Sequence, residues 1–240
     1  MRARLRLFTL LAFAALAAAS VTAQSAEKAP APTKTPRRTS NQQQLVNQAL
    51  TTWKNFLADP NLPWIREHAG EAMGFLIAPR IVRAGFIFGG SGGRGVLIVR
   101  GANGWRGPAF YSIGTASAGF QAGVQVSESV MVVMTQSGLD SLMTQSFTMG
   151  ADASVAAGPV GAGAGGTVRT DFVSFTRNRG LYGGVSVSGA VIRPSRDWNT
   201  AFWAKPLTPI EIIVQGMGHN AGADALMKAV GTAAAPPAAK

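Results

Sequence analysis

The chain has 240 residues, with 22 lysines and arginines against 11 aspartates and glutamates, and no cysteine. The absence of cysteine excludes a disulfide framework and a lipid-modified N-terminal cysteine. His68 and His219 lie far apart in the sequence, and the carboxylates nowhere cluster at metal-ligand spacing or pair closely for acid–base catalysis. We therefore expect no metal, no cofactor and no pair of catalytic carboxylates.

Residues 1–23 have the layout of a secretory signal peptide. Three arginines precede an apolar run from Leu7 to Ala19, and Val21 and Ala23 fit the positions before a cleavage site. The run is shorter than the ~20 residues that span a bilayer, so cleavage after Ala23 is favoured over a retained membrane anchor. We expect an exported protein that is periplasmic, peripherally attached to a membrane, or secreted.

Two helices are expected at the start of the mature chain. Residues 24–41, rich in Pro, Thr and basic residues, are predicted to be a disordered linker. Ser40 or Asn41 can cap the amphipathic helix that follows, whose apolar residues recur from Leu45 to Leu57. Its polar face carries one charge, whereas membrane-surface helices usually carry several basic residues, so docking on the protein's own core is favoured over docking on a membrane. Pro63 begins a second helix across WIREHAGEAM.

From Phe75 onward the chain changes to short β-rich runs punctuated by glycine. These runs are GFIFGG, GVLIVRG, PAFYSIG, FQAGVQVSESVMVVMTQ, ADASVAAGPVG, GTVRTDFVSFTRNRG and LYGGVSVSGAVIRP. No long helix separates them, so antiparallel hairpins are favoured over parallel crossovers. A short helix is expected at SGLDSLMTQSF, and two more at RDWNTAFW and TPIEIIV, the last with a capping box formed by Thr208 and Glu211.

These elements predict an α+β fold. Its core is antiparallel and glycine-punctuated, in twisted sheets or a barrel-like arrangement, with N-terminal amphipathic helices and short C-terminal helices. The predicted domain spans residues 42–216. Residues 217–240 are rich in Ala, Gly and Pro and are expected to be a frayed tail.

The stretch GGSGGRG, Gly89 to Gly95, matches two motifs at once. It contains the GxGxxG of dinucleotide-binding proteins and the GxSxG of a nucleophile elbow around Ser91. Both motifs require a helix after the turn, whereas VLIVR is a β-branched run, so a glycine-rich turn between strands is favoured. A serine hydrolase that uses Ser91 with His219 and Asp171 or Asp197 remains an alternative.

Positive charge is concentrated between Ala72 and Ser127, where five arginines occur without a carboxylate. They are Arg80, Arg83, Arg94, Arg100 and Arg106. If they share a face, they form a surface for phosphate-bearing partners, and the alternative is five unrelated solvated side chains. No aromatic stacking pattern or recognition helix accompanies the charge, and the protein is expected to be exported, so nucleic acid is not an expected partner.

The order of the pieces resembles the SYLF domain, a lipid-binding domain of yeast actin-patch proteins and of bacterial exported proteins. The resemblance is carried by AMGFLIAPRIVRAGFIFGGSGGRGVLIVRGANGWRGPAFYSIGTASAGFQAGVQVSESVMVV, then ASVAAGPVG, FVSFTRNRGLYGGVSVSGAVI and RDWNTAFW. It covers roughly Pro63 to Val214. The resemblance implies association with phospholipid head groups, with phosphoinositides and actin as ligands in the eukaryotic branch, and no catalytic activity.

Residues and resemblance together predict a non-enzymatic module that binds anionic phospholipid at an envelope membrane through the five arginines. Trp53, Phe56 and Trp64 are candidates for insertion into the membrane, although packing in the core is favoured for them. A structural or protein-interaction role in the envelope, with the basic tail binding an acidic partner, is the alternative function. Actin is not an expected partner of an exported protein. Surface binding and enclosure of a lipid chain between the sheets both stay open.

Overall fold

The computed structural model describes residues 40–85, 88–118, 123–158, 170–179 and 189–235. The predicted signal peptide lies outside the described residues, as does the predicted linker apart from its last two residues. The elements described below belong to one compact unit, Thr39–Lys240. In the described ranges no helix has the length and apolar character needed to cross a membrane.

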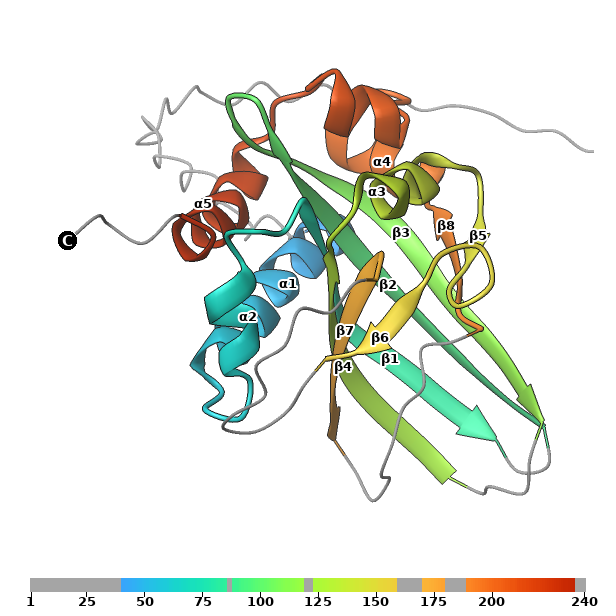
Figure 1. The fold of residues 1–240 in the computed structure, drawn as a ribbon. Coiled ribbons are helices and arrows are strands. Elements are labelled where there is room, and N and C mark those ends of the chain that lie inside the picture. Colours follow the sequence, from blue (N-terminus) through green and yellow to red (C-terminus); the bar gives the residue numbers. More distant parts are fainter. Residues whose placement is uncertain (1–39, 86–87, 119–122, 159–169, 180–188, 236–240) are drawn as a thin grey trace, which may run out of the picture. The chain divides into compact units, whose positions relative to one another are not determined.

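The described strands form one curled sheet, which confirms the predicted α+β class (Figure 1). The strands are β1 Gly74–Gly85, β2 Phe88–Gly101, β3 Gly104–Ala118, β4 Gly123–Val133, β5 Phe147–Thr148, β6 Val155–Ala157, β7 Phe172–Arg179 and β8 Val191–Pro194. Their order is β5-β8-β3-β2-β1-β4-β7-β6. All neighbours are antiparallel except β6 and β7, which are parallel.

Helices precede and follow the long strands. They are α1 Asn41–Ala58, α2 Pro63–His68, α3 Gln136–Met143, α4 Arg196–Trp203, the π-helical turn η1 Ile210–Val214, the 3-10 turn η2 Ala221–Ala223 and α5 Asp224–Ala233. Ser40 caps α1, since its Oγ accepts a hydrogen bond of 3.2 Å from the Gln43 N–H. The predicted capping box is confirmed, because Glu211 accepts from the Thr208 N–H at 2.7 Å and the Glu211 N–H donates to Thr208 Oγ1 at 3.3 Å.

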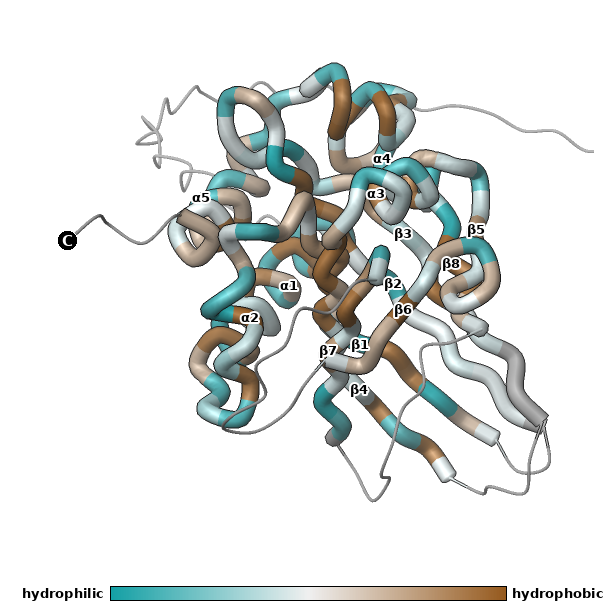
Figure 2. Tube along the Cα trace, in the orientation of Figure 1, coloured by the Kyte–Doolittle hydropathy of each residue, from teal (hydrophilic) through white to brown (hydrophobic). Residues whose placement is uncertain are grey.

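The two faces of the sheet are covered by different helices. On the first, which we name the α1 face, Trp53 of α1 lies 4.6 Å from the Phe75 ring, and Phe202 of α4 lies 5.1 Å from the Phe110 ring. On the second, the α3 face, the buried Tyr111 hydroxyl donates to a carbonyl of α3. Figure 2 shows hydrophobic residues concentrated near the helices, while the far strand ends are paler and more hydrophilic.

Three sequence-based expectations are wrong. The GGSGGRG stretch is part of β2 and not a turn between strands. GFLIAPRIVRAG was not among the predicted runs, yet it forms the central strand β1. The described residues after Gly216 are not a frayed tail, because α5 buries Leu226 and Val230 completely against the core.

Pro79 explains why β1 is difficult to predict. Proline donates no ladder hydrogen bond and is normally confined to edge strands or bulges. Here β1 has a bulge, since the pair Ile77–Val96 is followed by the pair Arg80–Arg94, with two residues between them on β1 and one on β2. A bulge accommodates the missing donor and also reverses the alternation of side chains along the strand.

Candidate functional site

Arg80, Arg94 and Arg193 stand in one row on the α1 face, and we name them the basic row. Arg80 of β1 pairs with Arg94 of β2, Arg94 pairs with Ser112 of β3, and Ser112 pairs with Arg193 of β8. Laterally paired residues point to the same side of a sheet. All three arginines are exposed, so the sheet presents three cations over four adjacent strands.

The bulge in β1 determines which arginines join this row. Before the bulge, Phe75 and Ile77 face α1, and after it Arg80 and Val82 do so. Uninterrupted alternation would place Arg80 on the α3 face, because side chains alternate with a period of two residues. Arg83 therefore points to the α3 face, away from the row.

The basic row has few internal contacts. The Arg94 guanidinium lies 4.5 Å from the ring centroid of Trp198, a cation–π contact that orients it. No hydrogen bond or ion pair joins Arg80, Arg94 or Arg193 to another residue in the part of the chain that the structure describes. Since strands are spaced ~4.8 Å apart, the row spans about 15 Å from β1 to β8, enough to contact more than one phosphate of a surface.

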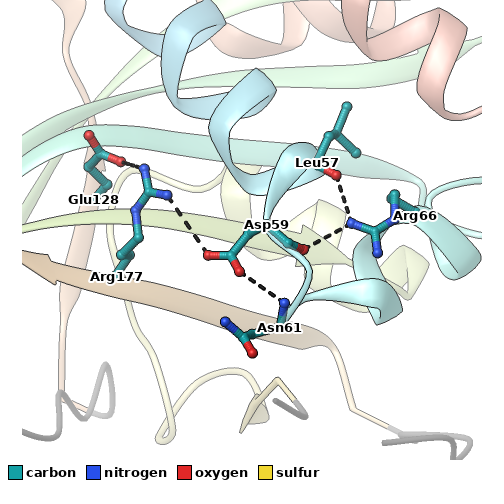
Figure 3. A network of polar contacts seen from close by, with 6 residues as sticks. All are labelled: Leu57, Asp59, Asn61, Arg66, Glu128 and Arg177. Atoms are coloured by element: carbon teal, nitrogen blue, oxygen red, sulfur yellow. Dashed lines mark hydrogen bonds and ion pairs between the residues drawn. The ribbon is translucent and has the colours of Figure 1, made fainter. Parts of the chain in front are cut away.

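The far end of the same face holds an ion pair, drawn in Figure 3. Arg177 of β7 donates to the Glu128 carboxylate of β4 at 2.7 Å and lies 3.9 Å from a carboxylate oxygen of Asp59. The Glu128 side chain is 8% exposed, and Arg177 also lies 5.3 Å from the ring of Phe56. This pair fixes the end of α1 to the sheet.

The loop between α1 and α2 is held by the same network (Figure 3). Arg66 of α2 donates to the carbonyls of Leu57 and Asp59 at 2.7 and 2.9 Å. The Asp59 carboxylate accepts from the Asn61 N–H at 2.9 Å. These contacts within the α1–α2 segment fix the orientation of α2 relative to the end of α1.

An open groove of about 460 Å³ lies beside Arg80, between α1 and the sheet. Its lining residues are Gln44, Asn47, Gln48, Thr51, Thr52, Pro79, Arg80, Val126 and Glu128. The polar side of α1 therefore faces this groove with uncharged amides and hydroxyls. The apolar side of α1 is buried, with Trp53 and Phe56 both 0% exposed, and Trp64 of α2 is 1% exposed. These three aromatic residues lie in the core.

Two of the five arginines in the carboxylate-free segment make contacts within the protein. Arg100 donates to the carbonyls of Ala69, Gly70 and Ala234 and lies 4.9 Å from the Trp105 ring centroid. Arg106 donates to the carbonyls of Ile213 and Val214. Both guanidiniums tie the C-terminal elements to the sheet.

Of the five arginines, the structure thus brings together Arg80 and Arg94 and places the other three elsewhere. The third member of the row, Arg193, was missed because it lies far along the chain. In the sequence Arg193 is a lone cation within a predicted β-rich run. Only the pairing of β8 with β3 shows that it lies in one row with Arg94 on the α1 face.

The alternative of a serine hydrolase finds no support in the geometry. The Ser91 hydroxyl shares a hydrogen bond of 2.5 Å with Thr115, and Asp171 accepts hydrogen bonds from Thr135 and Ser154. His219 lines a separate pocket of about 220 Å³ beside two tryptophans. Over the described residues no group of three or more His, Asp or Glu side chains is placed to hold a metal ion.

The fold and the basic row define an α+β protein that presents an exposed cationic surface on one face of its sheet. Residues 114–233 match the model of the Ysc84 family, described as Las17-binding protein actin regulator, and the chain belongs to this family. The match confirms the resemblance to the SYLF domain. It ends at the last residue of α5, so the domain extends beyond Gly216.

Curated relatives come from fungi and mammals. The chain is 33% identical to LAS seventeen-binding protein 3 of Saccharomyces cerevisiae over 53% of its length and 30% of that protein. It is 31% identical to Protein YSC84 of the same yeast, over 62% of the chain and 33% of the relative. It is 28% identical to human SH3 domain-containing YSC84-like protein 1, over 55% of the chain and 41% of the relative. The chain thus spans less than half the length of these relatives. No solved structure matches it.

Proposed function

We propose that this protein is a non-enzymatic module that attaches to anionic phospholipid surfaces through the basic row Arg80, Arg94 and Arg193. The observation that carries the proposal is the position of three exposed guanidiniums on one face of a rigid sheet, none bonded to a carboxylate of the described chain. The Ysc84/SYLF domain is associated with lipid binding and actin regulation, which supports a lipid ligand.

The expected binding energy is modest and depends on salt. Each basic side chain near an anionic membrane contributes about 1 kcal/mol, so the row contributes roughly 3 kcal/mol. Exposed charges are screened over a Debye length of about 10 Å at 0.1 M ionic strength, so attachment weakens as salt rises. The row is suited to reversible attachment of a peripheral protein.

The proposed location is an envelope membrane of the cell that exports the protein. This rests on the basic and apolar pattern of residues 1–23, which is typical of a signal peptide. The family description and the name of one yeast relative, LAS seventeen-binding protein 3, refer to Las17. For an exported chain we propose anionic phospholipid as the partner, in place of actin.

The test is co-sedimentation of the purified protein with vesicles of neutral and of anionic lipid, at low and at high salt. We expect binding to anionic vesicles only, and we expect Arg80→Gln combined with Arg94→Gln to weaken it about 30-fold, equivalent to about 2 kcal/mol. The matched control is Lys205→Gln combined with Lys228→Gln, which removes the same charge from exposed positions outside the row.

The control should bind within threefold of the wild type. Equal losses in the two double variants would show that net charge, and not the row, drives binding. Negligible binding to both vesicle types by the wild type would refute the membrane role and favour a protein partner in the envelope.

A further inference from the structure

We infer that the α3 face of the sheet carries a second site, which binds a phosphate-bearing ligand between Arg83 and Gln125. Arg83 of β1 pairs with Gln125 of β4 on one side and with Ser91 of β2 on the other, and Ser91 pairs with Thr115 of β3. Paired residues share a face, so these four polar side chains form a row of their own. The bulge in β1 places this row on the side opposite to the basic row.

Gln125 is the most informative member. Its side chain is 3% exposed, and neither Nε2 nor Oε1 has a hydrogen-bond partner among the residues that the structure describes. Glutamine is rarely buried, and an amide that loses water without gaining a partner destabilises the folded state. Nε2 therefore requires a hydrogen-bond acceptor and Oε1 a hydrogen-bond donor, and a bound ligand can supply both.

A second unpaired polar atom lies on the same face. Asn178 of β7 pairs with Ser127, which is two residues from Gln125 along β4 and shares its side of the sheet. The Asn178 Oδ1 atom is buried and has no hydrogen-bond partner within the described ranges. Two buried amides with unpaired atoms on neighbouring strands point to a polar ligand and not to an isolated packing defect.

Arg83 supplies the charge. It is half-buried, and it makes no hydrogen bond or ion pair with any residue in the described ranges. Cβ atoms of directly opposed residues in an antiparallel pair lie ~5 Å apart, so Arg83 and Gln125 can contact one small group together. A guanidinium carries five donors in a planar fork, which matches the oxygens of a phosphate.

The set of donors and acceptors defines the class of ligand. Arg83 and Gln125 Nε2 donate to anionic oxygens, whereas Gln125 Oε1 accepts and so needs a hydroxyl from the ligand. The Ser91 and Thr115 hydroxyls, 2.5 Å apart, lie on the other side of Arg83. A phosphoester with a neighbouring hydroxyl meets these requirements, whether it is a free metabolite such as glycerol phosphate or the head group of a lipid.

The test measures binding of three probes to the purified protein by calorimetry and thermal unfolding. The probes are inorganic phosphate, glycerol 3-phosphate and short-chain phosphatidylglycerol below its micelle concentration. We expect glycerol 3-phosphate or the lipid to bind and to raise the Tm, and Arg83→Gln to weaken binding at least tenfold. A preference for the lipid would identify a head-group site, and a preference for the free ester a metabolite site.

Two further variants keep the test independent of folding defects. Gln125→Met removes both unpaired atoms at similar volume, so the free protein should melt at a higher temperature while the ligand-induced rise in Tm disappears. Arg94→Gln, on the opposite face, should bind the soluble probes like the wild type while its binding to anionic vesicles weakens about fivefold.

The inference is overturned if no probe raises the Tm of the wild type, or if Arg83→Gln binds as tightly as the wild type. Equal weakening by Arg94→Gln would also overturn it, since the two faces would then not be separate sites. The outcome does not depend on the proposed function, because different variants weaken vesicle binding and phosphoester binding.

Discussion

Arg80 and Arg94 lie directly opposite each other on the antiparallel strands β1 and β2, with both side chains exposed on the α1 face. Like charges in directly opposed positions repel each other and destabilise a sheet. Glu128, which lines the same groove as Arg80, is bonded to Arg177 at 2.7 Å. This arrangement is unfavourable for the free protein and favourable for contact with an anionic surface, as expected for a binding site.

The repulsion predicts that a loss of charge stabilises the fold. Arg80→Gln should raise the free energy of unfolding by about 0.5 kcal/mol at low salt, with a smaller gain at high salt because screening already reduces the repulsion. Urea unfolding at two ionic strengths measures this. Arg193→Gln is the control, because Arg193 stands opposite Ser112 and its replacement should leave stability unchanged. An equal gain in both variants would contradict the explanation.

Two adjacent glycines of β2 should respond differently to alanine. A Cβ at Gly93 would lie 2.5 Å from the Arg80 carbonyl oxygen and 3.1 Å from Ile81, whereas a Cβ at Gly92 meets nothing within 4 Å. Gly93→Ala should therefore destabilise the protein by about 2 kcal/mol, since the backbone of the bulge must move. Gly92→Ala should be neutral or slightly stabilising, because alanine has less freedom in the unfolded chain. Thermal unfolding distinguishes them, and similar Tm values would refute the close approach at Gly93.

The pair of Arg177 and Glu128 predicts a loss of stability that a second change restores. Arg177→Met removes the guanidinium that donates to the largely buried Glu128 carboxylate at 2.7 Å and should cost about 2 kcal/mol, less than for a fully buried pair because Arg177 is 33% exposed. Adding Glu128→Gln removes the negative charge that this guanidinium balanced and should recover at least half of the loss. Chemical denaturation of the wild type and three variants completes the cycle, and simple additivity of the two changes would argue against coupling.

The carboxyl group of Asp171 makes the free energy of unfolding depend on pH in the acidic range. Hydrogen bonds from the Thr135 hydroxyl, and from the Ser154 hydroxyl and N–H, lower the pKa of its carboxyl group. Because the folded pKa lies below the ordinary value of about 3.9, the stabilisation is complete above that value and is lost as the pH falls through the folded pKa.

Asp171→Asn should therefore lower the free energy of unfolding by about 1 kcal/mol at neutral pH, a value kept small because the carboxylate is largely hydrated. The difference from the wild type should shrink below pH ~4. Unfolding curves measured across this range test the prediction. Ser154→Ala should reproduce part of the loss, and a difference that is independent of pH would show that the carboxylate charge is not involved.

Local features of this protein could be predicted well. The apolar repeat in α1, the Ser40 cap and the Thr208–Glu211 capping box depend on residues a few positions apart, so their patterns are complete within a short stretch. The antiparallel class followed from short β-rich runs with no long helix between them. The prediction failed at β1 because Pro79 interrupts the β pattern, and at α5 because alanine and glycine conceal a helix that only packing stabilises.

The sequence by itself determined that arginines are concentrated in a segment without carboxylates, and that most of this segment is β-strand. Only the tertiary structure decided which of them can act together. The bulge at Pro79 turns Arg80 toward the α1 face and Arg83 toward the α3 face, and the pairing of β8 with β3 brings Arg193 into the basic row. Because side chains alternate every residue, a shift of one position moves a charge to the other side of the sheet. Strand order and bulge position arise from contacts between distant segments, so a short sequence window does not contain them.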